Sequence, residues 1–184
     1  MAYFFFDFRD KDKKQDVRNF LTSLLTQLSA LEPCRNICLR LYHTHDKGAR
    51  QPSIDDLKGC LMEMLNVVAQ HPVYIIVDAL DECPEGVSEN PTPRERVLSL
   101  VEDLADMQLP SLHICVTSRP EADITDVLEP LACFTVSLHD ESGQQKDICD
   151  YVRKDVYSDR KMRKWRDGEK KLVVEELTNK ADGM

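Results

Sequence analysis

The chain has 184 residues, of which 42% are hydrophobic and 31% are charged, and its formal net charge is −9. These proportions are typical of one globular domain with a real core, and they exclude a disordered chain. The acidic balance disfavours nucleic acid and anionic membrane as partners. No apolar run reaches the roughly 18 residues that a membrane span needs, so we expect a cytoplasmic protein.

The cysteines favour the same compartment. There are seven of them, an odd number scattered mostly through apolar segments, as in proteins that keep their thiols reduced. Cys34, Cys38, His43 and His45 leave a zinc site open as an alternative. Their spacing is not a common zinc-finger pattern, and the competing interpretation is a helix end followed by a polar loop.

The first half of the chain alternates strand and helix signals. The aromatic residues 3–8 predict a short strand, and apolar residues at spacings of three and four over 17–31 predict an amphipathic helix that ends near Pro33. Ser53 is expected to cap a second helix that continues to about residue 68.

The middle of the chain continues this alternation. The unbroken apolar run 73–77 predicts a strand that is buried on both faces, as in a parallel sheet. A helix with apolar residues over 97–107, a second buried strand over 112–117 and a short helix before Pro130 follow. Residues 133–138 are expected to form a last strand.

The chain closes with helices from Ser142 onward and over residues 168–180, a helical extension of about residues 142–184. Strands that alternate with helices predict an α/β fold, with a mostly parallel sheet flanked by helices.

Polar side chains follow two of the predicted strands. Asp78, Asp81 and Glu82 come directly after the first buried run, and Ser118 and Arg119 come after the second. In open parallel sheets, ligands bind beyond the carboxyl ends of the strands. The two groups are therefore expected to lie side by side at one edge of the sheet.

These residue types suit phosphate chemistry. A carboxylate at a strand tip, here Asp78, can hold Mg²⁺ directly or through water, and small Ala79 leaves room beside it. Glu82 is placed to accept a proton from an attacking water, and the Arg119 guanidinium could contact a γ-phosphate. Alternatively, the acids only cap a loop and Arg119 is a surface cation.

The motifs resemble a known class. The stretch VYIIVDALDE resembles the Walker B strand of the NACHT class of STAND NTPases, and HICVTSRPE resembles its sensor strand. The segments YFFFDFRDKDKKQDVRNFLTSLLTQL, LHDESGQQKDICDYV and ELTNKADGM resemble its neighbouring parts. The likeness is greatest to fungal NACHT proteins with ankyrin or WD40 repeats, often labelled nephrocystin-3-like N-terminal domains.

The resemblance implies a P-loop NTPase-like fold and a nucleotide-driven signalling switch. Asp78 would be the Mg²⁺-associated acid, Asp81 and Glu82 the acids that serve hydrolysis, and Arg119 the sensor arginine, with Ser118 beside the nucleotide. The cofactors would be Mg²⁺ with ATP or GTP. The partners would be nucleotide and other protein domains or NACHT homologues.

One part of the class pattern is missing. No lysine in the chain is followed by Ser or Thr, so no G-x-x-x-x-G-K-[ST] phosphate loop is present. In the class, the strand that leads into this loop lies in the sheet between the sensor strand and the final strand. We therefore expect residues 1–184 to be a partial NACHT domain, cut at both ends and without turnover of its own.

Two alternatives stay open. The chain could be a non-catalytic interaction module derived from a NACHT domain, which binds relatives through an exposed sheet edge. A receiver domain phosphorylated on Asp78 is less consistent, because that chemistry needs a lysine after a late strand and His139-Asp140 stand there instead.

Overall fold

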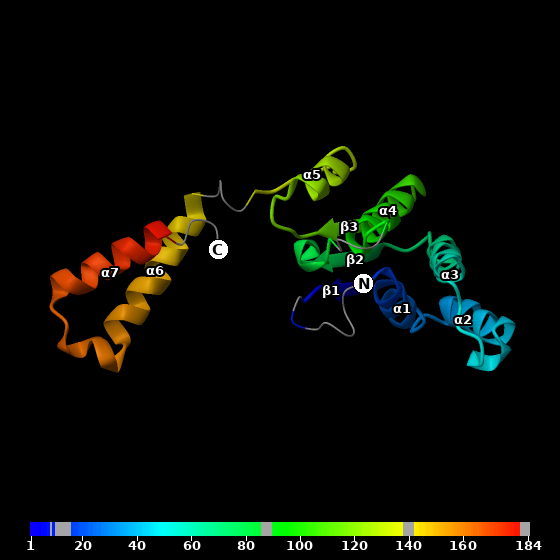
Figure 1. Cartoon of the computed structure of the whole chain (residues 1–184), viewed down its shortest axis with the longest axis horizontal. Helices are drawn as coiled ribbons and strands as arrows, with labels where there is room; N and C mark the ends of the chain where they lie inside the picture. Colours follow the sequence, from blue (N-terminus) through cyan, green and yellow to red (C-terminus); the bar gives the residue numbers. More distant parts are fainter. Residues whose placement is uncertain (8, 10–15, 86–89, 138–141, 181–184) are drawn as a thin grey trace. The chain divides into compact units, whose positions relative to one another are not determined.

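The computed structural model describes residues 1–7, 9, 16–85, 90–137 and 142–180. The chain divides into two compact units, Met1–Ala132 and Cys133–Met184 (Figure 1). The elements of the first unit, in chain order, are β1 (Ala2–Phe5), α1 (Val17–Leu28), α2 (Glu32–Thr44), η1 (Asp46–Gly48), α3 (Ile54–Val67), β2 (Val73–Asp78), η2 (Leu80–Glu82), α4 (Pro93–Asp106), β3 (Leu112–Val116) and α5 (Ala122–Leu128).

The described strands form one parallel sheet in the order β1-β2-β3. Phe4 pairs with Val77, and Val77 pairs with Val116, so these side chains point to the same side of the sheet. Phe4 and Val77 are buried there in one hydrophobic core with residues of α1, α3 and α4, among them the fully buried Phe20 and Leu61. The α/β class with a parallel sheet is thus confirmed.

The opposite face of the sheet is open. Tyr3, Phe5 and Tyr74 are 46%, 48% and 49% exposed. The Tyr74 ring stacks on His113 of the neighbouring strand, with 4.8 Å between ring centroids. The expectation that the 73–77 strand is buried on both faces is wrong, because the helices of the described first unit share a core on the other side.

The helix predicted over 17–31 is confirmed as α1, but the helix that follows it, α2, was not predicted. α1 ends at Leu28, and α2 begins at Glu32 with Pro33 in its first turn, so this proline starts a helix rather than stopping one. The interpretation of residues 34–45 as a helix end followed by a polar loop holds only at its close, since α2 continues to Thr44 before η1 follows. The buried residues of α2, Cys34 and Ile37, pack into the core.

Other elements lie close to where the sequence predicts them. α3 and α4 both begin with a capping box, formed by Ser53 with Asp56 and by Thr92 with Glu95. β1 is shorter than predicted, with Phe8 outside the described residues. Both β3 and the short α5 are present, but the expectation that β3 is a buried strand is wrong, because its residues are half-buried or exposed.

The predicted last strand is not formed. Residues 133–137 are irregular, and Leu138 lies outside the described residues. The apolar side chains of this segment stay uncovered: Phe134 and Val136 are 84% and 56% exposed. Within the described residues, β3 therefore keeps one edge unpaired.

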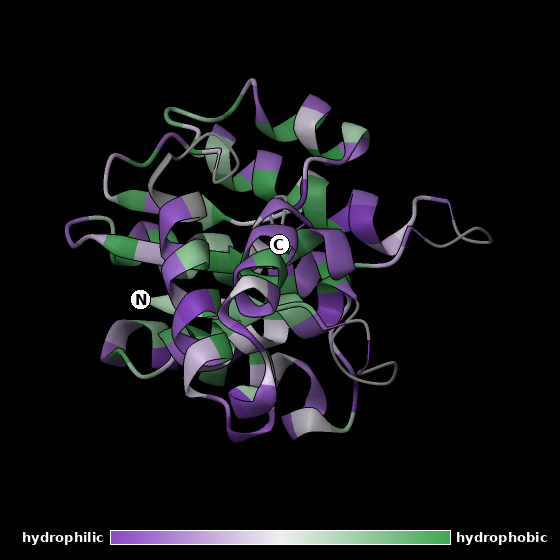
Figure 2. Ribbon diagram, turned by 90° about the vertical axis from the view of Figure 1, so that its left-hand side faces the viewer, coloured by the Kyte–Doolittle hydropathy of each residue, from purple (hydrophilic) through white to green (hydrophobic). Residues whose placement is uncertain are grey.

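The second unit is a helical hairpin, formed by α6 (Ser142–Ser158), η4 (Arg160–Lys164) and α7 (Asp167–Lys180). Val156 and Val174 are buried between its helices, and the ammonium of Lys170 lies 5.2 Å from the centre of the Tyr157 ring. Figure 2 shows hydrophobic and hydrophilic residues alternating along the helices of the chain. None of the described helices combines the length and apolar character that a membrane crossing requires.

Candidate functional site

The ends of β2 and β3 are joined by side-chain and backbone hydrogen bonds. Thr117 donates its hydroxyl to the Asp78 carboxylate at 2.5 Å and accepts the Ala79 N–H at 3.0 Å. Its carbonyl accepts the Leu80 N–H at 3.0 Å. Asp78 pairs in register with Phe5, whose side chain lies on the open face. The Asp78 carboxylate therefore lies at the carboxyl edge of the sheet, on its open side.

Ala79 turns the chain sharply away from the strand. Its backbone is left-handed, with φ 54° and ψ 50°, a conformation that costs a residue with a Cβ about 1–2 kcal/mol. The turn allows the 3-10 helix η2 to begin at Leu80, which is fully buried. Asp81 and Glu82 follow in this 3-10 turn, directly after the strand tip.

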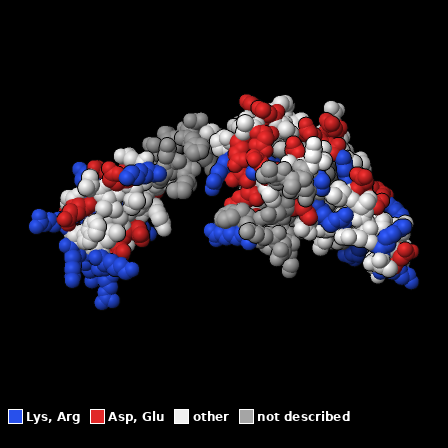
Figure 3. Space-filling view, in the orientation of Figure 1, with Lys and Arg blue, Asp and Glu red and all other residues white. Residues whose placement is uncertain are grey.

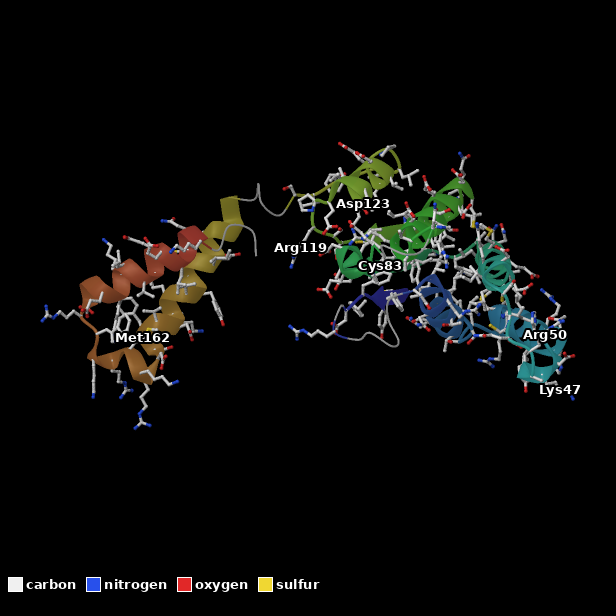
Figure 4. All side chains as sticks on the ribbon, in the orientation of Figure 1. Lys47, Arg50, Cys83, Arg119, Asp123 and Met162 are labelled. Atoms are coloured by element: carbon white, nitrogen blue, oxygen red, sulfur yellow. The ribbon has the colours of Figure 1, made fainter. Side chains whose placement is uncertain are left out.

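Asp81 connects the two predicted groups of site residues. Its side chain is only 9% exposed, and its carboxylate accepts the backbone N–H of Arg119 at 3.1 Å. The Arg119 Nε lies 3.5 Å from the same carboxylate, while the side chain as a whole is 81% exposed (Figure 4). Asp81 thus fixes the start of the Arg119 segment and leaves the guanidinium accessible to a ligand.

Glu82 and Ser118 complete the predicted set. Glu82 is half-buried, and its N–H closes the η2 turn on the Ala79 carbonyl at 2.9 Å. Ser118 is exposed and donates its hydroxyl to the Arg119 carbonyl at 2.7 Å. The sequence-predicted residues therefore gather at one edge of the sheet.

Sequence reasoning missed Arg94, which is only 5% exposed in the first turn of α4. Its guanidinium donates to the backbone carbonyls of Cys83 at 2.9 Å and Asp81 at 2.7 Å. Arg94 therefore fixes the backbone of the loop that follows β2.

The same guanidinium reaches across to the start of α5. Its Nη1 contacts three carboxylates, those of Glu85, Glu121 and Asp123, at 2.9, 2.5 and 3.1 Å. Burial alone would lower the pKa of Arg94, but the hydrogen bonds to Asp123 and Glu121 outweigh it and the pKa is raised. The segments that follow β2 and β3 are thus both bonded to the buried Arg94 guanidinium. The one sequence signal for this cluster was that acidic residues recur after each of the two strands.

These contacts bear on metal binding. Among the described residues, Glu85, Glu121 and Asp123 are the one group of potential metal ligands that converges. Because Arg94 contacts all three, the cluster is an arginine site. The zinc alternative fails for Cys34 and His45, which instead contact the Met64 carbonyl and Asp56.

The ends of β2 and β3 carry oxygen ligands, which suit Mg²⁺ rather than zinc. The Asp78 carboxylate and the Thr117 hydroxyl offer oxygen ligands, which Mg²⁺ prefers, and Mg²⁺ sites in nucleotide enzymes often use one carboxylate together with phosphate oxygens. The donor set therefore fits Mg²⁺.

Comparison with known protein families shows to which family the chain belongs. The family model described as "Nephrocystin 3, N-terminal" matches residues 1–119. The chain belongs to the nephrocystin 3 N-terminal family. In this family member, the matched region runs from β1 to Arg119 and includes Asp78, Asp81 and Arg94. The comparisons with curated proteins and with solved structures gave no match.

Proposed function

We propose that the chain supplies half of a magnesium–nucleotide site in a signalling switch of the NACHT class, using ATP or GTP. One observation carries the proposal: Asp78 is bonded to Thr117 while Asp81 is bonded to Arg119. An acid suited to Mg²⁺ and an exposed guanidinium suited to phosphate therefore stand on adjoining strand tips.

The sheet supports this reading. Parallel order β1-β2-β3 places the Asp78 strand next to the Arg119 strand, as the resemblance implies. The unpaired edge of β3 is where the class would add the strand that leads into its phosphate loop. A P-loop NTPase-like arrangement is thus our interpretation of a small sheet that the described residues leave incomplete.

The residues take distinct roles in this proposal. Bound Mg²⁺ would neutralise charge on the phosphates, and Asp78 would hold it. Glu82 would accept a proton from the attacking water, and the Arg119 guanidinium would contact the γ-phosphate. Asp81, assigned to hydrolysis by the resemblance, we now assign to positioning, because its carboxylate is occupied by Arg119.

Saturation-transfer NMR of the whole chain tests the half-site, because it detects weak binding. We expect transfer to ATP or GTP protons in the presence of Mg²⁺, lost in Asp78→Asn. Asp106→Asn is the matched control. Asp106 is an exposed residue at the end of α4, so this substitution removes the same charge at a position away from the strand tips. Saturation transfer that does not depend on Mg²⁺, or that is equally strong in both variants, would contradict the proposal.

Turnover is a separate question. Without a phosphate-loop lysine in the sequence, we expect the chain alone to release no phosphate from ATP or GTP. Release that disappears in Glu82→Gln would show a complete catalytic centre and refute this expectation.

A second candidate function rests on the open face and free edge of the sheet. Tyr3, Phe5 and Tyr74 are half exposed there, and β3 has an unpaired edge within the described residues. Both features suit a non-catalytic module that binds a NACHT homologue by strand addition. Co-purification with such a homologue, unchanged by Asp78→Ala, would favour this function over nucleotide binding.

A further inference from the structure

The turn between α6 and α7 carries a dense group of positive charges. Five cations fall within residues 160–166, interrupted only by Met162 and Trp165. We call this segment the basic tip; its cations are Arg160, Lys161, Arg163, Lys164 and Arg166. All five are exposed, and Figure 3 shows blue side chains gathered at this end of the hairpin.

The 3-10 geometry of η4 sorts these side chains into rows. Residues three apart in a 3-10 helix lie above one another. Arg160 therefore aligns with Arg163, and Lys161 aligns with Lys164. Met162 is half-buried, and Trp165, which ends η4 with an extended backbone, donates its N–H to the Met162 carbonyl at 3.1 Å. The tip thus presents two cationic rows, followed directly by one exposed indole.

Among the residues that the structure describes, the cations have no acidic partners of their own. Within the described residues, no ion pair joins any cation of the basic tip to a carboxylate. The neighbouring acids are turned to the backbone: Asp159 accepts the Lys161 N–H at 2.8 Å, and Glu169 accepts the Arg166 N–H at 2.7 Å. Asp167 is exposed beside them. The five positive charges are therefore available to an external anion.

We propose that the basic tip binds the surface of membranes that contain anionic phospholipids. Lys and Arg contact anionic headgroups, and an indole ring prefers the boundary between headgroups and acyl chains. Trp165 is 45% exposed in the middle of the cations, as such a surface requires. Single-stranded nucleic acid is normally held in a groove with several stacking aromatics, whereas the tip offers one ring on a turn.

The net charge of −9 does not oppose this proposal. At physiological salt, surface charges are screened beyond about 8 Å, so a membrane senses the five cations of the tip together with the flanking Asp159, Asp167 and Glu169, a local balance that is still positive, and not the distant acids. Each cation near an anionic surface strengthens binding by about fivefold. The cations with one indole thus combine electrostatic attraction with an aromatic anchor at the interface.

The chain contains one tryptophan, so intrinsic fluorescence of the whole chain reports on the tip without a label. We expect the Trp165 emission to shift to the blue with vesicles of phosphatidylcholine containing about a third phosphatidylserine, and not with pure phosphatidylcholine. Lipids brominated near the headgroup should quench the emission. Raising the salt concentration should weaken binding at least tenfold.

Arg163→Glu with Lys164→Glu should reduce vesicle affinity by at least tenfold. Arg153→Glu with Lys154→Glu is the matched control, because it changes the same charge at exposed positions on α6 and should leave affinity within twofold. Both variants must keep the wild-type circular dichroism and melting temperature, and otherwise the single Lys164→Gln replaces the double change. No shift with anionic vesicles, an equal loss in both variants, or a shift with single-stranded DNA alone overturns the proposal.

Discussion

The carboxylate of Asp81 accepts the backbone N–H of Arg119 at 3.1 Å, and this bond joins the loop after β2 to the segment after β3. Asp81 is 9% exposed at the side chain, whereas Arg119 is 81% exposed. The acid is therefore a fixed anchor, and the arginine is the part of the pair that can meet a ligand.

Asp81→Ala should loosen this junction. A hydrogen bond to a charged acceptor contributes about 1.5–3 kcal/mol, so without it the Arg119 amide should exchange with solvent roughly 10- to 100-fold faster. Asp81→Asn keeps an acceptor oxygen and should retain most of the protection. Hydrogen exchange followed by NMR measures both, and equal protection in all three proteins would show that the anchor is unimportant.

Arg94→Met should lower the free energy of unfolding by about 2–4 kcal/mol, because it removes one cation from three carboxylates and two carbonyls. Arg94→Lys should recover part of this loss, since an ammonium cannot reproduce the planar fork of a guanidinium. Urea unfolding measures the difference. A Met variant as stable as the wild type would contradict the anchoring role.

Ala79→Gly should stabilise the chain by about 0.5–1 kcal/mol. The gain from relieving the left-handed backbone exceeds the entropy that glycine adds to the unfolded chain. Ala105→Gly, near the end of α4, is the control and should destabilise by a similar amount. If both glycines destabilise the protein in urea unfolding, Ala79 is not strained.

Cys38 should react with iodoacetamide faster than an ordinary thiol near pH 7. A hydrogen bond from Cys60 lowers the pKa of Cys38 to about 7, although burial opposes this shift, and the pKa of Cys60 is raised. A lowered pKa means that thiolate appears at lower pH, so Cys38 labelling should rise through pH 7 rather than through its usual range.

Cys60→Ala removes the donor, so labelling of Cys38 at pH 7 should fall by roughly tenfold. Cys115→Ala is the control, because Cys115 is exposed on β3. Peptide mass spectrometry distinguishes the sites. A Cys38 rate that does not respond to Cys60→Ala would exclude the hydrogen bond as its cause.

The sequence predicted features that local patterns encode. The apolar run before Asp78 and the cap at Ser53 gave β2 and α3 with nearly correct bounds. Pro33 misled the prediction because proline both stops a helix and starts one, and only the packing of Cys34 against α3 favours the second outcome.

Two other features depend on tertiary contacts that no local pattern encodes. Residues 133–137 alternate like a strand but form none, although an edge of β3 is unpaired among the described residues. Arg94 looks like an ordinary helix-surface cation, and its burial follows only from the convergence of Glu85, Glu121 and Asp123. The strand-tip residues were easier to find, because the carboxyl edge of a parallel sheet gathers whatever follows each strand.

Paramagnetic broadening by Mn²⁺, a substitute for Mg²⁺, tests most directly whether the two strand tips form one ion–phosphate site. With Mn²⁺ and ADP at low ratios, we predict that the amide signals of Ala79 and Arg119 broaden first and together, and that Asp78→Asn abolishes the effect while Asp106→Asn does not. Broadening that begins elsewhere in the chain, or that persists in Asp78→Asn, would contradict the proposed site.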